Sequence, residues 1–292
     1  MSVDAVTLSY WSQAASAGTG LLFLASAVRT AWRPLASRLL HGLAVGGLIG
    51  TIALGVSTYV RRWLEVGHVP TQTFWEALVM AALCAEVSFG VIYVVNRFHR
   101  VRGRSAAFVD VFGLLMCAVV GFLYSQAQAK TSAAETVPPV LNSPYFIPHV
   151  TVMILGYGAG ITAAIMGAVF LFMGRGKTDV QLDTDRGLMG IDAFCYRTVM
   201  VGFPLLTAGL CLGALWANES WGTYWGFDSK ETWALITWLC FLGYLHLRFA
   251  GGWRGRKACW FLALGGVVIF VTFLLFGYLP DSVASSQHRY IN

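Results

Sequence analysis

The sequence predicts an all-α protein, a polytopic transmembrane helical bundle of about eight spans with both termini on the extracytoplasmic side. Three observations predict this fold. The 292 residues are 57% hydrophobic and only 12% charged, which is roughly half the charged fraction of a soluble domain. Apolar runs of about 20 residues, each long enough to cross a bilayer as a helix, recur along the chain. Basic residues gather in alternate connections between these runs.

The first four predicted spans cover residues 8–31, 39–60, 74–95 and 105–123. Pro34 interrupts the helical pattern between the first two spans. A polar connection over residues 61–73 precedes the third span, which carries Glu76 and Glu86. A basic segment follows the third span, and a long polar segment with several prolines, residues 124–148, follows the fourth.

The other four predicted spans cover residues 149–173, 195–216, 232–249 and 258–279. A loop of mixed charge, residues 174–192, separates the fifth span from the sixth, and a polar tail follows the eighth. Neither a repeat nor a separate soluble domain is visible. We therefore expect a single integral membrane domain over residues 1–292, with a tryptophan-rich segment at 202–248 inside it.

The distribution of charge predicts the orientation. Most of the 20 Lys and Arg residues fall in the connections near residues 29–38, 97–104, 175–197 and 248–257, which places these connections in the cytoplasm. The net charge of +6 thus reports topology, and nucleic-acid binding is not expected. The N-terminus lacks the basic start of a cleavable signal peptide. Arg far outnumbers Lys, which favours a bacterial cytoplasmic membrane over a thylakoid membrane.

The six cysteines all lie in or beside apolar runs, and none belongs to a CxxC or CxxCH motif. We expect them to be small buried hydrophobic residues. The chain is therefore not expected to be a c-type cytochrome itself, and it shows no thiol-redox motif.

The stretch WANESWGTYWGFDSKETWALITW, residues 216–238, has the highest density of aromatic residues in the chain. A belt of Trp and Tyr at the membrane surface explains one or two rings at each helix end. It does not explain a loop spaced by glycines and rich in acids and bases. The pattern predicts a platform of flat rings with a polar rim, which suits a large planar ligand with charged edges. The rings and rim residues of this platform are Trp216, Trp221, Tyr224, Trp225, Asp228 and Lys230.

Two histidines, His149 and His288, are predicted to share the extracytoplasmic side with this stretch. One such histidine alone is most simply a hydrated surface residue, but two neutral imidazoles beside an aromatic platform would supply both axial ligands of a haem iron. His246 lies near the inner end of the seventh span. It is either a functional group within the membrane or a side chain that reaches the inner headgroups beside Arg248. His41 is expected to pack at the membrane interface.

Asp228 and Glu231 have the spacing of a capping box at the start of the seventh span. We expect both acids to anchor this helix end. Lys230 would then be available to face an acidic group of the ligand.

The segment at residues 202–248 resembles the tryptophan-rich WWD domain of the CcsA/ResC family, which handles haem in system II cytochrome c maturation. Phe227 stands where that family commonly has Trp, and Ser229 where it commonly has Pro. LNSPYFIPHV and SQHRY resemble the family segments that carry its two external haem-ligating histidines, here His149 and His288. The second of these matches retains only part of the family pattern.

This resemblance implies that the chain presents haem b on the outer membrane face for covalent attachment to the CxxCH motif of an apocytochrome c. It implies a CcsB/ResB-type membrane partner, which would oppose His246 at a haem site within the membrane. Haem would pass from there to the outer site between His149 and His288. The chain would be one component of a holocytochrome c synthase, in which positioning of haem is its main contribution.

Three alternatives remain open. A CcmC-like haem chaperone of the other maturation pathway shares a related tryptophan-rich loop, but it predicts about six spans and no histidine within the membrane. A b-type electron-transfer cytochrome needs histidine pairs at matching depths in facing helices, whereas two of the three candidates here lie in loops. A solute transporter has no support beyond the number of helices.

Overall fold

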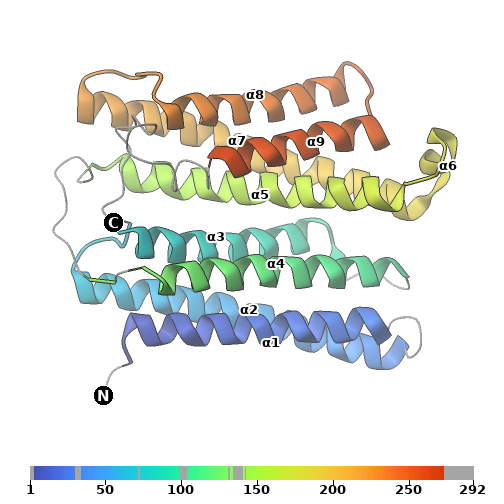
Figure 1. Cartoon of the computed structure of the whole chain (residues 1–292), viewed down its shortest axis with the longest axis horizontal. Coiled ribbons are helices and arrows are strands. Elements are labelled where there is room, and N and C mark those ends of the chain that lie inside the picture. Colours follow the sequence, from blue (N-terminus) through green and yellow to red (C-terminus); the bar gives the residue numbers. More distant parts are fainter. Residues whose placement is uncertain are drawn as a thin grey trace. The chain divides into compact units, whose positions relative to one another are not determined.

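A computed structural model describes residues 3–29, 34–71, 73–98, 104–130, 132–133, 141 and 143–272, and the regular structure in these ranges is helical (Figure 1). The helices are α1 (Ala5–Arg29), α2 (Pro34–Val66), α3 (Phe74–Val95), α4 (Arg104–Gln128), α5 (Phe146–Met173), α6 (Asp179–Thr184), α7 (Arg186–Trp221), α8 (Ser229–Phe249) and α9 (Gly255–Phe270). The all-α prediction is confirmed for these residues.

The chain forms two compact units, one over Met1–Leu141 and one over Asn142–Arg289. The N-terminal unit contains α1 to α4, and the C-terminal unit contains α5 to α9. Within each unit the long helices run alternately in opposite directions (Figure 1). In the C-terminal unit this alternation brings the start of α5, the end of α7 and the start of α8 to the same end.

Among the described residues, five helices are long and apolar enough to cross a membrane, namely α2, α3, α4, α5 and α7. The chain is therefore a membrane protein. Each of the eight predicted spans overlaps a helix in the described part of the chain, but α8 carries several charged residues, and α9 is short there. The number of eight spans and the location of the termini remain predictions.

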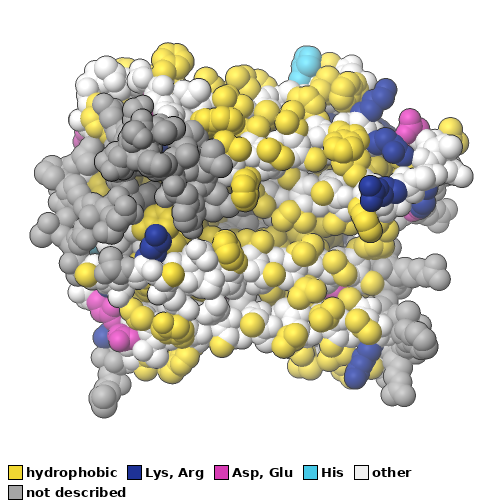
Figure 2. Space-filling model, in the orientation of Figure 1, with side chains coloured by type: hydrophobic (Ala, Val, Ile, Leu, Met, Phe, Trp, Pro, Cys, Tyr) yellow, Lys and Arg dark blue, Asp and Glu magenta, His cyan; other side chains and the backbone are white. Residues whose placement is uncertain are grey.

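Hydrophobic side chains cover the sides of the helices in both units (Figure 2). In the C-terminal unit, Lys and Arg side chains gather around α6 and the adjoining end of α5 (Figure 2). This is the end that the charge distribution assigns to the cytoplasm.

The prediction of a loop over residues 61–73 is wrong for its first part, because α2 continues to Val66. Arg62 lies inside this helix and its Nε donates to Glu76 Oε1 of α3 at 2.8 Å, with both side chains almost completely buried. The ion pair with Glu76 thus offsets the free-energy cost of burying the charged Arg62 side chain between the helices. Pro34, predicted to interrupt the helical pattern between the first two spans, is the first residue of α2, a position where no backbone hydrogen bond is lost.

The predicted loop over residues 174–192 is also partly wrong, because it contains α6 and the first turns of α7. Asp185 starts α7 by accepting hydrogen bonds from the amides of Gly187 and Leu188, at 2.9 and 3.2 Å. Lys177 donates to the same carboxylate at 2.7 Å, and this hydrogen bond lowers the pKa of Asp185. The charges in this segment therefore cap a helix, where a sequence pattern suggests only a solvated connection.

Small residues allow α5 and α7 to pack closely. A Cβ atom at Gly202 would lie 2.6 Å from the Ala159 side chain, and one at Gly156 would lie 2.8 Å from Leu206. Close backbone approach of this kind is how helices associate in a membrane, where burial of apolar surface from water is no longer the driving force. The two helices that carry the candidate site are therefore held firmly against each other.

Candidate functional site

The site is built around the first turn of α5, which places His149 next to the last turns of α7. The Ser143 hydroxyl donates to the Glu219 carboxylate near the end of α7 and accepts from the Tyr145 amide at 3.2 Å. The start of α5 thus contacts α7 at two points: Ser143, just before α5, bonds Glu219, and His149, in its first turn, bonds Gly209.

His149 is held in one orientation by the backbone of α7. Its Nδ1 lies 2.7 Å from the carbonyl oxygen of Gly209. A carbonyl oxygen can only accept, so Nδ1 carries the proton of this hydrogen bond, and the lone pair of the neutral ring is then on Nε2. This is the tautomer in which a histidine binds a metal through Nε2 while a carbonyl orients the ring.

The missing side chain of Gly213 makes room for this ring, because a Cβ atom there would lie 2.6 Å from His149 Cε1. On the other side, the Trp216 ring stacks against the imidazole, with ring centroids 6.0 Å apart and planes at 21°. Trp216 is only 2% exposed. Trp216 is therefore a buried ring packed against His149; the sequence predicts it as one ring of the aromatic platform.

Trp216 also connects the imidazole to further aromatic rings. Its centroid lies 5.0 Å from that of Phe146 and 4.8 Å from that of Trp221, which meets it edge to face. Edge-to-face contacts between aromatic rings stabilise such clusters beyond their buried area. The described residues thus bring together three of the predicted site residues: His149, Trp216 and Trp221.

The loop between α7 and α8 is shaped by its two helix ends. Gly222 closes α7 with φ +75°, and its amide donates to the carbonyl of Asn218. At the other end, Asp228 Oδ1 accepts from the Glu231 amide at 2.7 Å, while Glu231 Oε2 accepts from the amides of Gly226 and Asp228 at 2.8 and 3.3 Å. The predicted capping box at Asp228 and Glu231 is confirmed, and it also secures the loop.

The tip of this loop presents aromatic rings to the surroundings. Tyr224 is 59% exposed and Phe227 is 74% exposed, and the half-buried Trp225 meets Phe227 edge to face at 6.1 Å. Phe227 has φ +54°, a conformation that is uncommon and strained for a large side chain. Strain and exposure of this kind are found where a loop is shaped for binding.

Lys230 adds a cation at the rim of the loop, just before the predicted seventh span. Burial lowers the pKa of Lys230 to about 8, and the charge of Asp228 opposes part of this shift. Its ammonium group is therefore costly to keep charged. A ligand carboxylate at this position would stabilise the charged form.

His246 lies far from His149. It is in the last turn of α8 and its side chain is exposed, and the 16 residues from Lys230 correspond to about 24 Å along the helix. The nearby Arg248 is held by Asp192, because its guanidinium donates to both carboxylate oxygens of that residue at 2.7 and 2.9 Å. His288, the second proposed axial ligand, lies outside the described residues.

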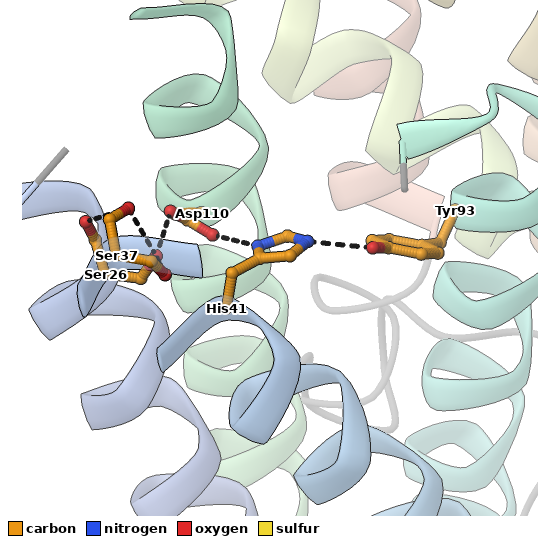
Figure 3. A network of polar contacts seen from close by, with 5 residues as sticks. All are labelled: Ser26, Ser37, His41, Tyr93 and Asp110. Atoms are coloured by element: carbon orange, nitrogen blue, oxygen red, sulfur yellow. Dashed lines mark hydrogen bonds and ion pairs between the residues drawn. The ribbon is translucent and has the colours of Figure 1, made fainter. Parts of the chain in front are cut away.

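The N-terminal unit contains a second polar network that the sequence analysis did not predict (Figure 3). His41 Nδ1 lies 2.5 Å from Asp110 Oδ1, and His41 Nε2 lies 2.8 Å from the Tyr93 hydroxyl. Ser26 donates to the other Asp110 oxygen at 2.6 Å, and its Oγ also lies 3.1 Å from the Ser37 carbonyl oxygen. An acid within an apolar span is a signal that could have pointed to this network.

Comparison with known proteins places these features in a family. Residues 71–283 match a family model described as "Cytochrome C assembly protein". A "Cytochrome c biogenesis protein CcsA" from Chlamydomonas reinhardtii is 34% identical over 232 residues, which cover 77% of this chain and 65% of that relative. Relatives of the same description are 29% identical over 91% of both chains in Gloeobacter violaceus, and 32% identical over 80% of both chains in Guillardia theta.

Proposed function

Since this chain belongs to the cytochrome c assembly protein family, we propose that it presents haem b on the extracytoplasmic face of the membrane for attachment to an apocytochrome c. Its function is cytochrome c biogenesis of the system II type, as in the CcsA proteins it is similar to. The match covers about two thirds of the Chlamydomonas relative. The details of substrate, site and partner are therefore our proposals.

The observation that carries this proposal is the orientation of His149. Its Nδ1 is bound to the Gly209 carbonyl and its ring is stacked on Trp216, beside a loop with exposed aromatic rings. These features suit an axial ligand, because they hold the lone pair of Nε2 in a fixed direction before the substrate arrives. A surface histidine without a ligand would have no need of these two restraints.

The remaining residues complete the outer site. We propose that His288 is the second axial ligand, and that Trp221, Tyr224 and Trp225 contact the faces and edges of the macrocycle. Lys230 would pair with a propionate, and Asp228 would hold the loop and α8 in register. Haem supplies the vinyl groups that react with the CxxCH thiols, while the chain orients it and limits access of water.

His246 would act earlier, at a site within the membrane. Its exposed side chain on α8 suits an axial haem ligand whose opposing ligand comes from another polypeptide. A CcsB/ResB-type membrane protein is the proposed partner. Haem would move from this site to the outer one, over a distance similar to the length of α8.

We place the protein in a bacterial cytoplasmic membrane in preference to a thylakoid. The relatives do not favour a CcmC-like chaperone or a b-type cytochrome.

Replacement of His149 by Gly tests the proposal. The full chain is expressed with its partner and a reporter cytochrome c, and bound haem is measured by absorbance after purification. We expect His149→Gly to lose most of the haem at the outer site and most cytochrome c assembly. Added imidazole should restore part of both, because it can occupy the open coordination position.

His68→Gly is the matched control. His68 is half-buried like His149, and its Nδ1 likewise lies near a carbonyl, that of Val69 at 3.1 Å. It lies in the connection between α2 and α3, however, and is remote in sequence from the aromatic loop. This variant should keep full haem and full assembly. If His149→Gly behaves like His68→Gly, the outer site needs a different ligand.

A further inference from the structure

Glu86 lies in the middle of the N-terminal unit and has no place in the proposed handling of haem. It is the thirteenth residue of α3, about 18 Å from the start of the helix, inside one of the five candidate spans. Its side chain is 2% exposed. An ionisable group at such a depth is rare unless it serves a purpose.

The other buried acids of the described chain all have partners. Glu76 pairs with Arg62, Asp110 with His41 and Ser26, and Asp192 with Arg248 and the Gly255 amide. Within the residues that the structure describes, neither carboxylate oxygen of Glu86 makes a hydrogen bond. Glu86 therefore differs from a structural acid, which is kept in place by a cation or by donors.

This lack of partners determines the form that the side chain prefers. An ionised carboxylate without donors or a cation costs several kcal/mol in an apolar interior. A neutral carboxyl group costs much less because it carries no net charge. Glu86 is consequently most stable with a proton bound, and it becomes charged only when water or a cation reaches it.

Two neighbouring helices are shaped around this carboxyl. A Cβ atom at Gly55 of α2 would lie 2.8 Å from Glu86 Oε2 and 3.1 Å from the hydroxyl of Tyr124 of α4. Tyr124 is 0% exposed, and its hydroxyl also lacks a hydrogen-bond partner among the described residues. Two unsatisfied polar groups from different helices thus converge on one glycine.

The surroundings of this point are polar but uncharged. Thr51 and Thr58 lie one turn on either side of Gly55 on α2, and both are buried. Thr58 Oγ1 lies 3.1 Å from the Ser12 hydroxyl of α1. Among the described residues, the titratable side chains that face Glu86 are Tyr124 and Cys117, both from α4, while α1 and α2 contribute hydroxyl groups and Gly55.

An apolar layer separates this region from the His41 network of Figure 3. Phe23, Phe89 and Phe112 are at most 1% exposed, and Phe89 contacts the other two rings at 6.2 and 5.1 Å. Phe89 lies on α3 between Glu86 and Tyr93. The two polar regions are therefore separated by buried aromatic rings.

We propose that Glu86, together with Tyr124, forms an intramembrane proton-binding site. The carboxylate takes a proton from a hydronium ion, leaving water and a neutral carboxyl group, and the reverse step releases the proton. The Tyr124 hydroxyl is the neighbour that stabilises the ionised form by donating to it. This site is independent of the proposed haem function, since it lies in α2, α3 and α4 of the N-terminal unit.

Infrared difference spectroscopy of the full chain in lipid nanodiscs tests this proposal. At neutral pH the wild-type protein should show the carbonyl stretch of a protonated carboxylic acid, and Glu86→Gln should lack it. The band should shift when the sample is transferred to D₂O, and it should disappear as the pH becomes strongly alkaline. Tyr124→Phe should change the position of the band without removing it.

Glu76→Gln is the control, because Glu76 lies on the same helix but is ion-paired with Arg62. It should leave the band unchanged. An identical carbonyl region in wild type and Glu86→Gln would overturn the proposal, and so would a band that responds neither to D₂O nor to pH. Loss of the band on addition of sodium at constant pH would indicate a cation site instead. If Glu86→Gln does not fold, Tyr124→Phe and the wild-type titration still decide the matter.

Discussion

At the scale of single residues, the position of His149 depends on two glycines of a helix that begins about 40 residues later in the chain. Gly209 contributes only its carbonyl oxygen, and Gly213 contributes only the absence of a side chain. Neither contribution involves a chemically reactive group. The ligand geometry of the candidate site is therefore sensitive to small changes in backbone packing.

Gly213→Ala should displace the His149 ring, because the added Cβ would lie 2.6 Å from Cε1. We expect a loss of haem affinity of roughly 5- to 150-fold, since overpacking of this kind costs on the order of 1–3 kcal/mol. Haem titration of the purified protein would measure the loss. Gly190→Ala on the same helix is the control, because its Cβ has open space. Equal affinities in the two variants would contradict the assigned role of Gly213.

At the scale of elements, the loop between α7 and α8 is organised by its helix caps. Gly222 ends α7 in the left-handed conformation, and Asp228 starts α8 with a capping box. The Glu231 carboxylate reaches back to the Gly226 amide and so fixes the middle of the loop. The acids of the loop thus hold the aromatic rings in place.

Asp228→Ala should destabilise the start of α8 by about 1 kcal/mol, the usual cost of losing a helix cap. Hydrogen exchange at the amides of Gly226 and Glu231 should accelerate several-fold, while the far end of α8 stays protected. Glu231→Gln is the matched control, because Gln also completes a capping box. Unchanged exchange in Asp228→Ala would show that packing of the rings, and not the cap, orders the loop.

At the scale of the whole molecule, the charge distribution and the reversals of the chain make one prediction about topology. Basic residues surround α6 and the ends of α5 and α9, whereas the aromatic loop lies at the other end of the C-terminal unit (Figures 1 and 2). The positive-inside rule then places the aromatic loop and His149 on the outer side.

Reporter fusions along the chain would check this orientation. Fusions after Lys177 and Arg254 should report a cytoplasmic location, and fusions after Lys130 and Ser220 an extracytoplasmic one. Phosphatase and fluorescent-protein activities give opposite signals on the two sides. The inverted pattern would place His149 in the cytoplasm and remove the basis for attachment of haem on the outer face.

The fold class, the approximate positions of the described helices and the capping box were all predictable from the sequence. Each depends on local properties: the length of an apolar run, the spacing of Asp228 and Glu231, and the transfer of side chains from water to lipid. The predicted spans were shorter than α2 and α7 for the same reason: α2 continues to Val66, and α7 already begins at Arg186. Arg62 and the turn after Asp185 look like loop residues until their partners are known.

The geometry of the candidate site and the two polar regions of the N-terminal unit required the packed helices. The tautomer of His149 depends on a carbonyl 60 residues away, and His41 meets an acid 69 residues away. Glu76 has Arg62 of α2 opposite it, whereas Glu86 has Gly55. Such contacts join residues that are distant in sequence, so no local periodicity records them, and they exist only once the helices have settled into one arrangement.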